Sequence, residues 1–375
     1  MKTVIKNNRF FCVIIKIGDN MKKVLIVILL IGLSFVAFYF NSGNQIGIVK
    51  EEIKQEEMVE KEEVKKEPLK EENKKEKNNL VSYNGKLKLN GVDLVNQYNE
   101  KIQLRGISTH GIQWYGKFAN EDVIKQLRDE WNANVIRIAM YTEENGYIYN
   151  KSLKNKVDEI VNIAIKHDMY VIIDWHILKD NNPNIHKEEA KKFFDEMSKK
   201  YKDVPNVIFE ICNEPNGNVT WNNVIKPYAE EIIKIIRNNS KESIIIIGTG
   251  TWSQDVHDAA NNPLKYDNIM YACHFYSGTH TSWLRDRVDY ARSKGIAIIV
   301  SEFGVSNADG TGGVFKEETL KWLEYLNNKN ISWINWSLSD KNETSALLKP
   351  GTPSNDISDK YLSESGKIIK EQMKK

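Results

Sequence analysis

Short apolar runs alternate with longer amphipathic stretches between residues 102 and 336. The apolar runs are rich in Val, Ile and Phe, which is typical of buried strands. The stretches between them repeat their apolar residues at three- and four-residue intervals, which predicts helices with one buried face. The predicted strands are 102–107, 135–140, 170–174, 207–212, 244–248, 269–274, 296–301 and 332–336. The predicted helices are 121–131, 153–167, 188–201, 221–238, 282–294 and 316–328, with a less periodic helix within 254–266.

This succession of strand–helix units predicts an α/β fold, and specifically a closed (β/α)8 TIM barrel rather than an open sheet. A short N-terminal β-hairpin is expected before the barrel, because residues 86–89 alternate in polarity and Asn90-Gly91 favours a tight turn. No Gly-x-Gly-x-x-Gly follows the first predicted strand, which argues against a dinucleotide-binding fold.

The N-terminal part of the chain has a different composition. Residues 24–40 form an uninterrupted apolar run behind two lysines, which is typical of a signal peptide or a short membrane anchor. As a helix the run would reach about 26 Å, slightly less than the hydrocarbon core of a bilayer. Basic residues precede the run, so the rest of the chain is expected to be extracellular, either membrane-anchored at the cell surface or secreted. Met21-Lys22-Lys23 would itself be a normal start of a signal peptide, so translation could begin at Met21 instead of Met1.

A segment dominated by Lys and Glu follows the apolar run, and it cannot bury enough apolar surface to fold. The predicted division is a signal peptide or anchor in 1–45, a charged linker in 46–79 and one large folded domain in 80–375.

The charge balance excludes one class of partner. The chain carries 53 Lys and Arg against 51 Asp and Glu. Because nucleic-acid binding needs a clustered basic surface, we expect no nucleic-acid partner. The 16 tyrosines and nine tryptophans favour a ligand with flat apolar faces, such as a sugar. Cys12, Cys212 and Cys273 form no disulfide framework or zinc motif, so we expect no metal and no cofactor.

Two glutamates stand at the ends of predicted strands. Ile211-Cys-Asn-Glu-Pro215 follows the fourth strand, and Val300-Ser-Glu-Phe-Gly304 ends the seventh. Burying an unpaired carboxylate is unfavourable, so Glu214 and Glu302 are expected at a functional site. Two carboxylates that face one bond are the minimum needed to cleave a glycoside. The alternative, in which they only cap helices or pair with arginines, is disfavoured because every other strand end is also polar or aromatic.

Five stretches carry a resemblance to a known family: Leu104–Trp114, Ile208–Gly217, Gly248–Val256, Tyr271–Tyr276 and Ile334–Lys341. They resemble glycoside hydrolase family five, and within it the secreted bacterial endoglucanases of the Bacillus type. Asn-Glu-Pro recurs widely among retaining glycosidases, whereas Gly-Thr-Gly-Thr-Trp-Ser-Gln-Asp-Val and Asn-Trp-Ser-Leu-Ser-Asp-Lys are much narrower motifs. The resemblance implies that 80–375 is the catalytic domain of a cellulase, an endo-β-1,4-glucanase that hydrolyses cellulose or related β-glucans by a retaining double displacement.

The resemblance also implies a role for individual residues. Glu214 would be the general acid/base and Glu302 the nucleophile. Arg137 and Tyr276 would hold Glu302 ionised and aimed, and Asn213 would bond the 2-hydroxyl of the cleaved sugar. The other expected contacts are His176 and His274 on the polar floor, Trp336 under the cleaved sugar, Trp252 on the leaving side, and His110, Trp114, Tyr141, Lys341 and Glu343 on the glycone side.

Two other functions stay open. A β-mannanase or a mixed-linkage β-glucanase would share the fold and both glutamates, because specificity depends on loop shape. An inactive sugar-binding barrel is disfavoured, because both glutamates occur together with the residues that would support them. We expect a polysaccharide substrate and a monomer, and any membrane contact is expected through residues 24–40.

Overall fold

The computed structural model describes residues 3–7, 10–16, 23–30, 33–40 and 80–375, the first four segments by their backbone alone. The chain forms two compact units, Met1–Leu69 and Lys70–Lys375. In the first unit, β1 to β4 form an antiparallel sheet in chain order. These strands are β1 (Thr3–Asn7), β2 (Phe10–Lys16), β3 (Lys23–Leu30) and β4 (Leu33–Phe40).

The apolar run 24–40 therefore lies largely within two adjacent strands. Within the described segments, no helix combines the length and the apolarity needed to cross a membrane. The predicted linker 46–79 lies outside the described residues.

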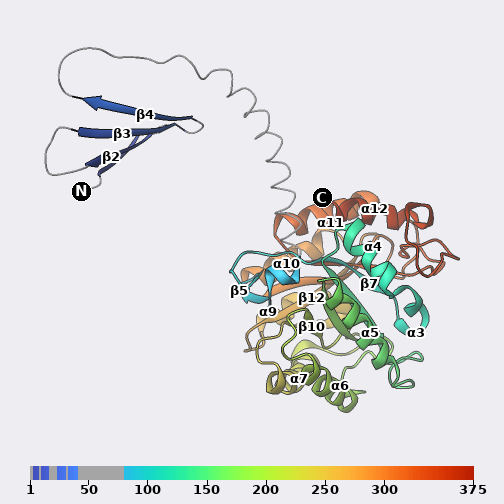
Figure 1. The fold of residues 1–375 in the computed structure, drawn as a ribbon. Helices are drawn as coiled ribbons and strands as arrows, with labels where there is room; N and C mark the ends of the chain where they lie inside the picture. The colour runs from blue at the N-terminus through green and yellow to red at the C-terminus, as the bar shows by residue number, and fades with distance from the viewer. Residues whose placement is uncertain (1–2, 8–9, 17–22, 31–32, 41–79) are drawn as a thin grey trace. The chain divides into compact units, whose positions relative to one another are not determined.

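Eight parallel strands close into a barrel in the second unit, which confirms the predicted fold (Figure 1). Neighbouring strands follow the chain order, and the last pairs with the first. The strands are β7 (Arg105–Thr109), β8 (Val135–Tyr141), β9 (Tyr170–His176), β10 (Val207–Glu210), β11 (Ile245–Ile247), β12 (Ile269–Tyr276), β13 (Ala297–Gly304) and β14 (Trp333–Leu338). β7 begins later than predicted, because the amide of Ile102 bonds to the carbonyl of Leu94 before the barrel starts.

Helices surround the strands, and most lie where the apolar periodicity predicts them (Figure 1). They are α4 (Glu121–Trp131), α5 (Leu153–Lys166), α6 (Lys187–Lys200), α7 (Lys226–Asn239), α9 (Val256–Asn261), α10 (Ser282–Ser293), α11 (Lys316–Asn328) and α12 (Glu364–Met373). One π-helical turn, Trp221–Ile225, precedes α7 in the stretch predicted as a single helix. The short helices α2 (Val81–Asn84), α3 (Ile112–Tyr115) and α8 (Gly250–Ser253) were not predicted, because one turn is too short to show a period.

The predicted hairpin is present as β5 (Lys88–Asn90) and β6 (Asp93–Val95), which pair in antiparallel fashion. Leu87 and Leu94 of this region belong to the same buried cluster as Ile172 of the barrel interior. The hairpin therefore packs against the interior of the barrel.

Side chains that point into the barrel change from apolar to polar towards the C-terminal ends of the strands. Val135 is followed two residues later by Arg137, and Ile208 by Glu210. The same step occurs from Ile172 to Asp174 and from Ala272 to His274, and Ile334 is followed two residues later by the aromatic Trp336. Because alternate residues of a strand share a face, this places a polar layer on top of the apolar one. Barrel enzymes carry their sites at this end.

A β-bulge in β13 alters this alternation. Ala272 and His274 of β12 pair with Ile299 and Glu302 of β13, so β13 contains one extra residue there. The register with β14 shifts over the same segment. The bulge brings the side chains of two consecutive residues to the interior.

Candidate active site

A cleft of about 650 Å³ opens over the polar end of the barrel. Every predicted site residue except Arg137 and Asn213 lines it. These are Glu214, Glu302, His176, His274, Tyr276, Trp336, His110, Trp114, Tyr141, Trp252, Lys341 and Glu343. Arg137 and Asn213 are fully buried next to this lining.

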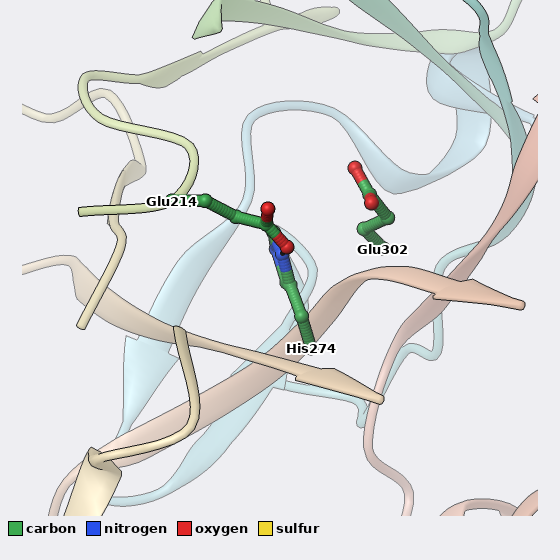
Figure 2. A group of neighbouring side chains, drawn as sticks. All are labelled: Glu214, His274 and Glu302. Carbon is green, nitrogen blue, oxygen red and sulfur yellow. Dashed lines mark hydrogen bonds and ion pairs between the residues drawn. The ribbon is translucent and has the colours of Figure 1, made fainter. Parts of the chain in front are cut away.

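The two glutamates face each other across the floor of the cleft. Carboxylate oxygens of Glu214 and Glu302 and a ring nitrogen of His274 all lie within 4.8 Å of one another. Figure 2 shows the side chain of Glu214 reaching His274, with the carboxylate of Glu302 nearby. Glu214 lies in the loop after β10, whereas Glu302 lies within β13 rather than beyond its end. The separation matches the short spacing of a retaining glycosidase better than the longer inverting one.

Both oxygens of Glu302 accept hydrogen bonds from groups that favour its ionised form. The hydroxyl of Tyr276 donates to Oε1 at 2.8 Å, and Arg137 donates to Oε2 at 3.2 Å. The other donors of the guanidinium are bound to Glu210 at 2.7 Å, Asp174 at 3.0 Å and Asn213 at 2.6 Å. Arg137 is thus a fixed cation, because its neighbouring acids hold its pKa above the ordinary value.

Glu214 has a different kind of partner. Its Oε1 lies 2.9 Å from Nδ1 of His274, and Nε2 of that ring lies 2.9 Å from Oγ of Ser301. The hydroxyl of Ser301 donates its proton to Glu210 at 2.7 Å, so its oxygen accepts from His274. The ring therefore carries its proton on Nε2, and Nδ1 is the acceptor. Burial keeps the imidazole neutral, lowering the pKa of His274 to about 4.

These hydrogen bonds decide which carboxyl holds the proton. Burial raises the pKa of Glu214 to about 8. Burial and the charge of Glu214 also raise the pKa of Glu302, while the guanidinium of Arg137 opposes that rise. Two carboxyls this close cannot both ionise readily, so they share one proton near neutral pH. That proton lies on Glu214, because Nδ1 of His274 needs a hydrogen-bond donor. Glu302 already accepts hydrogen bonds from two donors, Tyr276 and Arg137.

His176 and Asn213 form a second buried group beside Arg137. Nδ1 of His176 lies 2.6 Å from Asp174, and burial lowers the pKa of His176 to about 3. The amide nitrogen of Asn213 donates to Nε2 of His176 at 3.3 Å and to the carbonyl of Ile177 at 3.1 Å. The amide predicted to meet the sugar is therefore occupied within the protein, and its role in sugar binding stays a prediction.

Aromatic rings line one end of the cleft. Trp336 stacks on His176 with ring centroids 5.3 Å apart, and Tyr141 lies 4.1 Å from the same imidazole. His110 lies 4.9 Å from Trp336, and Trp114 lies 5.0 Å from Tyr141. Trp114 nevertheless keeps 41% of its surface exposed. This wall offers flat apolar faces to a ligand, as sugar binding requires.

Lys341 and Glu343 form an ion pair of 2.5 Å at the rim of the cleft. Ser345 donates a further hydrogen bond to Glu343 at 2.9 Å. This pair, with an exposed lysine and a buried glutamate, supplies charged hydrogen-bonding groups beside the aromatic wall.

The three grouped side chains Glu214, His274 and Glu302 could offer ligand atoms to a metal ion. Two features disfavour that use. Nδ1 of His274 is already bound to Glu214, and the guanidinium of Arg137 lies 3.2 Å from Glu302. A fixed cation in contact with the carboxylate repels a second one.

A strained turn presents the exposed Trp252. Thr251, Trp252 and Ser253 all have φ between 52° and 60°, a left-handed conformation that costs roughly 1–2 kcal/mol for each non-glycine residue. The amide of Trp252 donates to the carbonyl of Pro215 at 3.0 Å. This bond places the tryptophan beside the loop of Glu214. Strain of this kind is typical of functional sites.

Several residues of the site were not predicted. Glu210 and Ser301 are buried and connect Arg137 to His274. Both lie in apolar strands, where a polar residue in an inward position was the available signal. His280 and Trp283 also line the cleft. Nδ1 of His280 accepts from the amide of Tyr276 at 2.9 Å.

Comparison with known proteins gives consistent matches. Residues 95–342 match the family model described as cellulase (glycosyl hydrolase family 5). The chain is 54% identical over 295 residues to endoglucanase 5 of Pectobacterium carotovorum subsp. carotovorum, covering 78% of this chain and 58% of that protein. It is 56% identical over 277 residues to endoglucanase A of Evansella cellulosilytica, covering 73% and 57%. The chain thus spans less than two thirds of the length of these relatives.

A solved structure is similar as well. The catalytic domain of Thermobifida fusca endoglucanase Cel5A, in complex with cellotetraose, matches with a TM-score of 0.76 and 33% identity. The match covers 79% of this chain and 99% of that one.

Proposed function

The chain belongs to glycosyl hydrolase family 5, and from this membership we propose that it is an endo-β-1,4-glucanase that hydrolyses internal bonds of cellulose or related β-glucans. The observation that carries the proposal is the pairing of Glu214 with Glu302. Their carboxylate oxygens lie within 4.8 Å, one beside a neutral histidine and the other beside Arg137 and Tyr276. An acid and a nucleophile at this spacing are the requirement of a retaining glycosidase.

In the first step, Glu302 attacks the anomeric carbon while Glu214 gives its proton to the departing glycosidic oxygen. The glycosyl–enzyme ester forms as the leaving sugar departs with that proton. Tyr276 and Arg137 keep the attacking oxygens of Glu302 aimed.

In the second step, Glu214 is a carboxylate and takes a proton from water. The hydroxide equivalent attacks the same carbon and releases Glu302, which restores both groups. Two inversions at one carbon give net retention of the β-configuration.

The aromatic wall supports a polysaccharide substrate. Trp336, Tyr141 and Trp114 extend from the glutamates along one side, and Trp252 stands on the side of the Glu214 loop. Rings on both sides of the cleaved bond suit an enzyme that acts within a chain rather than at its end.

Hydrolysis of carboxymethylcellulose, compared with β-mannan and mixed-linkage β-glucan, tests this proposal with the full chain. We expect the viscosity of carboxymethylcellulose to fall early, before many reducing ends appear, as internal cleavage requires. Preferential cleavage of mannan would show instead that the protein is a β-mannanase. Binding without hydrolysis of any of the three polymers would indicate an inactive sugar-binding barrel.

We also propose an extracellular location, supported by the apolar run 24–40 and its basic flank. A polymer such as cellulose does not enter cells, so the proposed activity needs the barrel outside.

A further inference from the structure

We propose that Trp283 is a second sugar-stacking platform on the leaving side of the cleft, and that Arg287 and Asp255 hold it in a fixed relation to Trp252. The ligand is a pyranose unit of the β-linked chain beyond the bond that is cleaved. The inference rests on the proposed function and adds to it a reason for preferring long chains.

Trp283 lies in the first turn of α10 and lines the same cleft as Glu214 and Trp252. It keeps 39% of its surface exposed, and Trp252 keeps 45%. Large aromatic side chains normally gain by burial, so two exposed indoles in one cleft indicate surfaces kept for a ligand. The flat C–H face of a β-linked pyranose is the complement of an exposed indole.

A chain of contacts joins the two indoles. The guanidinium carbon of Arg287 lies 4.9 Å from the ring centroid of Trp283, within cation–π range. Its NH1 donates to Oδ1 of Asp255 at 2.7 Å. Oδ2 of Asp255 accepts from the hydroxyl of Thr251 at 2.6 Å, and Thr251 immediately precedes Trp252. Arg287 and Asp255 thus link α10 to the left-handed turn.

This link stabilises the strained turn. Three consecutive left-handed residues need side-chain bonds to hold them, and the bond from Thr251 to Asp255 is one of these. Arg287 orients the carboxylate of Asp255 by a hydrogen bond, and the same guanidinium lies over the ring of Trp283. A displacement of either indole would therefore disturb the other.

Both platforms lie on the leaving side by the same evidence. Trp252 is bonded through its backbone to Pro215, directly after the acid that protonates the leaving oxygen. Trp283 is bound to that turn through Arg287 and Asp255. A chain leaving Glu214 can meet both indoles only if it has several sugar units, whereas an aryl leaving group has a single ring.

The test compares a long substrate with a short one in Trp283→Ala. We expect KM for reduced-end-labelled cellohexaose to rise roughly three- to tenfold, the value of one aromatic stacking contact. The loss on dinitrophenyl β-cellobioside should be clearly smaller, because its leaving group does not reach the second platform and senses Trp283 only through the link to Trp252. Trp283→Phe should restore much of the loss. Tyr290→Ala, on the same helix and 40% exposed but outside the cleft, is the matched control.

Asp255→Asn tests the link, because it removes charge at nearly constant shape. We expect it to raise KM for cellohexaose and to shift the preferred cleavage point along the labelled chain. Equal losses on both substrates in Trp283→Ala, or no loss on either, would overturn the proposal. Should the wild type cleave β-mannan instead of glucan, the proposed function fails while mannohexaose gives the same comparison. A wild type that cleaves neither overturns both.

Discussion

Ser301 and Glu302 are consecutive in the chain, yet both side chains point into the barrel. Ser301 bonds His274 and Glu210, and Glu302 bonds Tyr276 and Arg137. Alternation along a strand would send one of them outward. The bulge in β13 removes this restriction, so one strand serves both proposed catalytic groups.

Replacing the proposed nucleophile should abolish turnover. Glu302→Gln keeps the shape of the side chain but removes the anionic oxygen that forms the ester. We expect the rate on carboxymethylcellulose to fall on the order of 10⁵-fold, as for residues that act as a unit. Glu317→Gln, exposed at the start of α11, should leave the rate unchanged. A Glu302→Gln enzyme with a tenth of wild-type turnover would exclude this role.

The stereochemical outcome should be retention. The short distance between Glu214 and Glu302 leaves no room for a water between the sugar and the second carboxylate. Proton NMR of cellopentaose hydrolysis, read before mutarotation, should show the β-anomer first. An early α-anomer would mean an inverting enzyme.

Activity should decline as pH rises through about 8, the pKa to which burial raises Glu214. Below this pH the carboxyl is protonated and can donate; above it the proton is lost. Removing the negative charge of Glu302 stabilises the ionised form of Glu214 and so lowers the pKa of Glu214. In Glu302→Gln, rescued with azide on an activated aryl substrate, the alkaline limb should therefore move to lower pH. An alkaline limb that does not move would show that the two groups are not coupled.

Ser301→Ala should alter the protonation of Glu214 from a distance. Without the hydroxyl, Nε2 of His274 loses its acceptor and Glu210 loses a donor. We expect a loss of about 1–3 kcal/mol in the free energy of unfolding, since buried polar groups lose their partners. Some molecules will then carry the histidine proton on Nδ1, which stabilises ionised Glu214. The alkaline limb of the pH profile should shift to lower pH.

Ser301→Thr keeps the hydroxyl and should keep the pH profile. A Ser301→Ala enzyme that loses stability but retains the wild-type profile would reduce the residue to a packing role.

Cell fractionation and sequencing of the mature N-terminus test the location. We expect activity outside the cell, and an uncleaved anchor would keep residues 24–40 in the membrane fraction. Soluble enzyme in the medium that begins near residues 41–50 would show instead that the segment is a cleaved signal. Activity confined to the cell interior would overturn the proposed location.

The fold could be predicted from the sequence because the apolar patterns of its strands and of its helices are both strong. The β-branched runs and the three- to four-residue spacing identify every barrel strand and the main helices, including α4 and α11 at their observed bounds. The order of strand ends then brings Glu214 and Glu302 together without any tertiary information.

Local departures from regular structure could not be predicted from the sequence. A bulge changes which face a residue takes, and no pattern within Ala297–Gly304 discloses the extra residue. Trp283 lies on a helix, where an aromatic residue is normally read as packing. The amide of Asn213 bonds His176 and Ile177, contacts between the ends of β9 and β10 that the sequence alone does not show, and its role in sugar binding stays a prediction.

Arg137 has a consequence for how the protein reaches activity. Its guanidinium contacts residues carried by β7, β9, β10 and β13, while its own backbone lies in β8. A fragment ending before β13 would hold this cation against Asp174 and Glu210 with no nucleophile to aim. Turnover can therefore appear during refolding only once β13 has joined the barrel and placed Glu302 against Arg137.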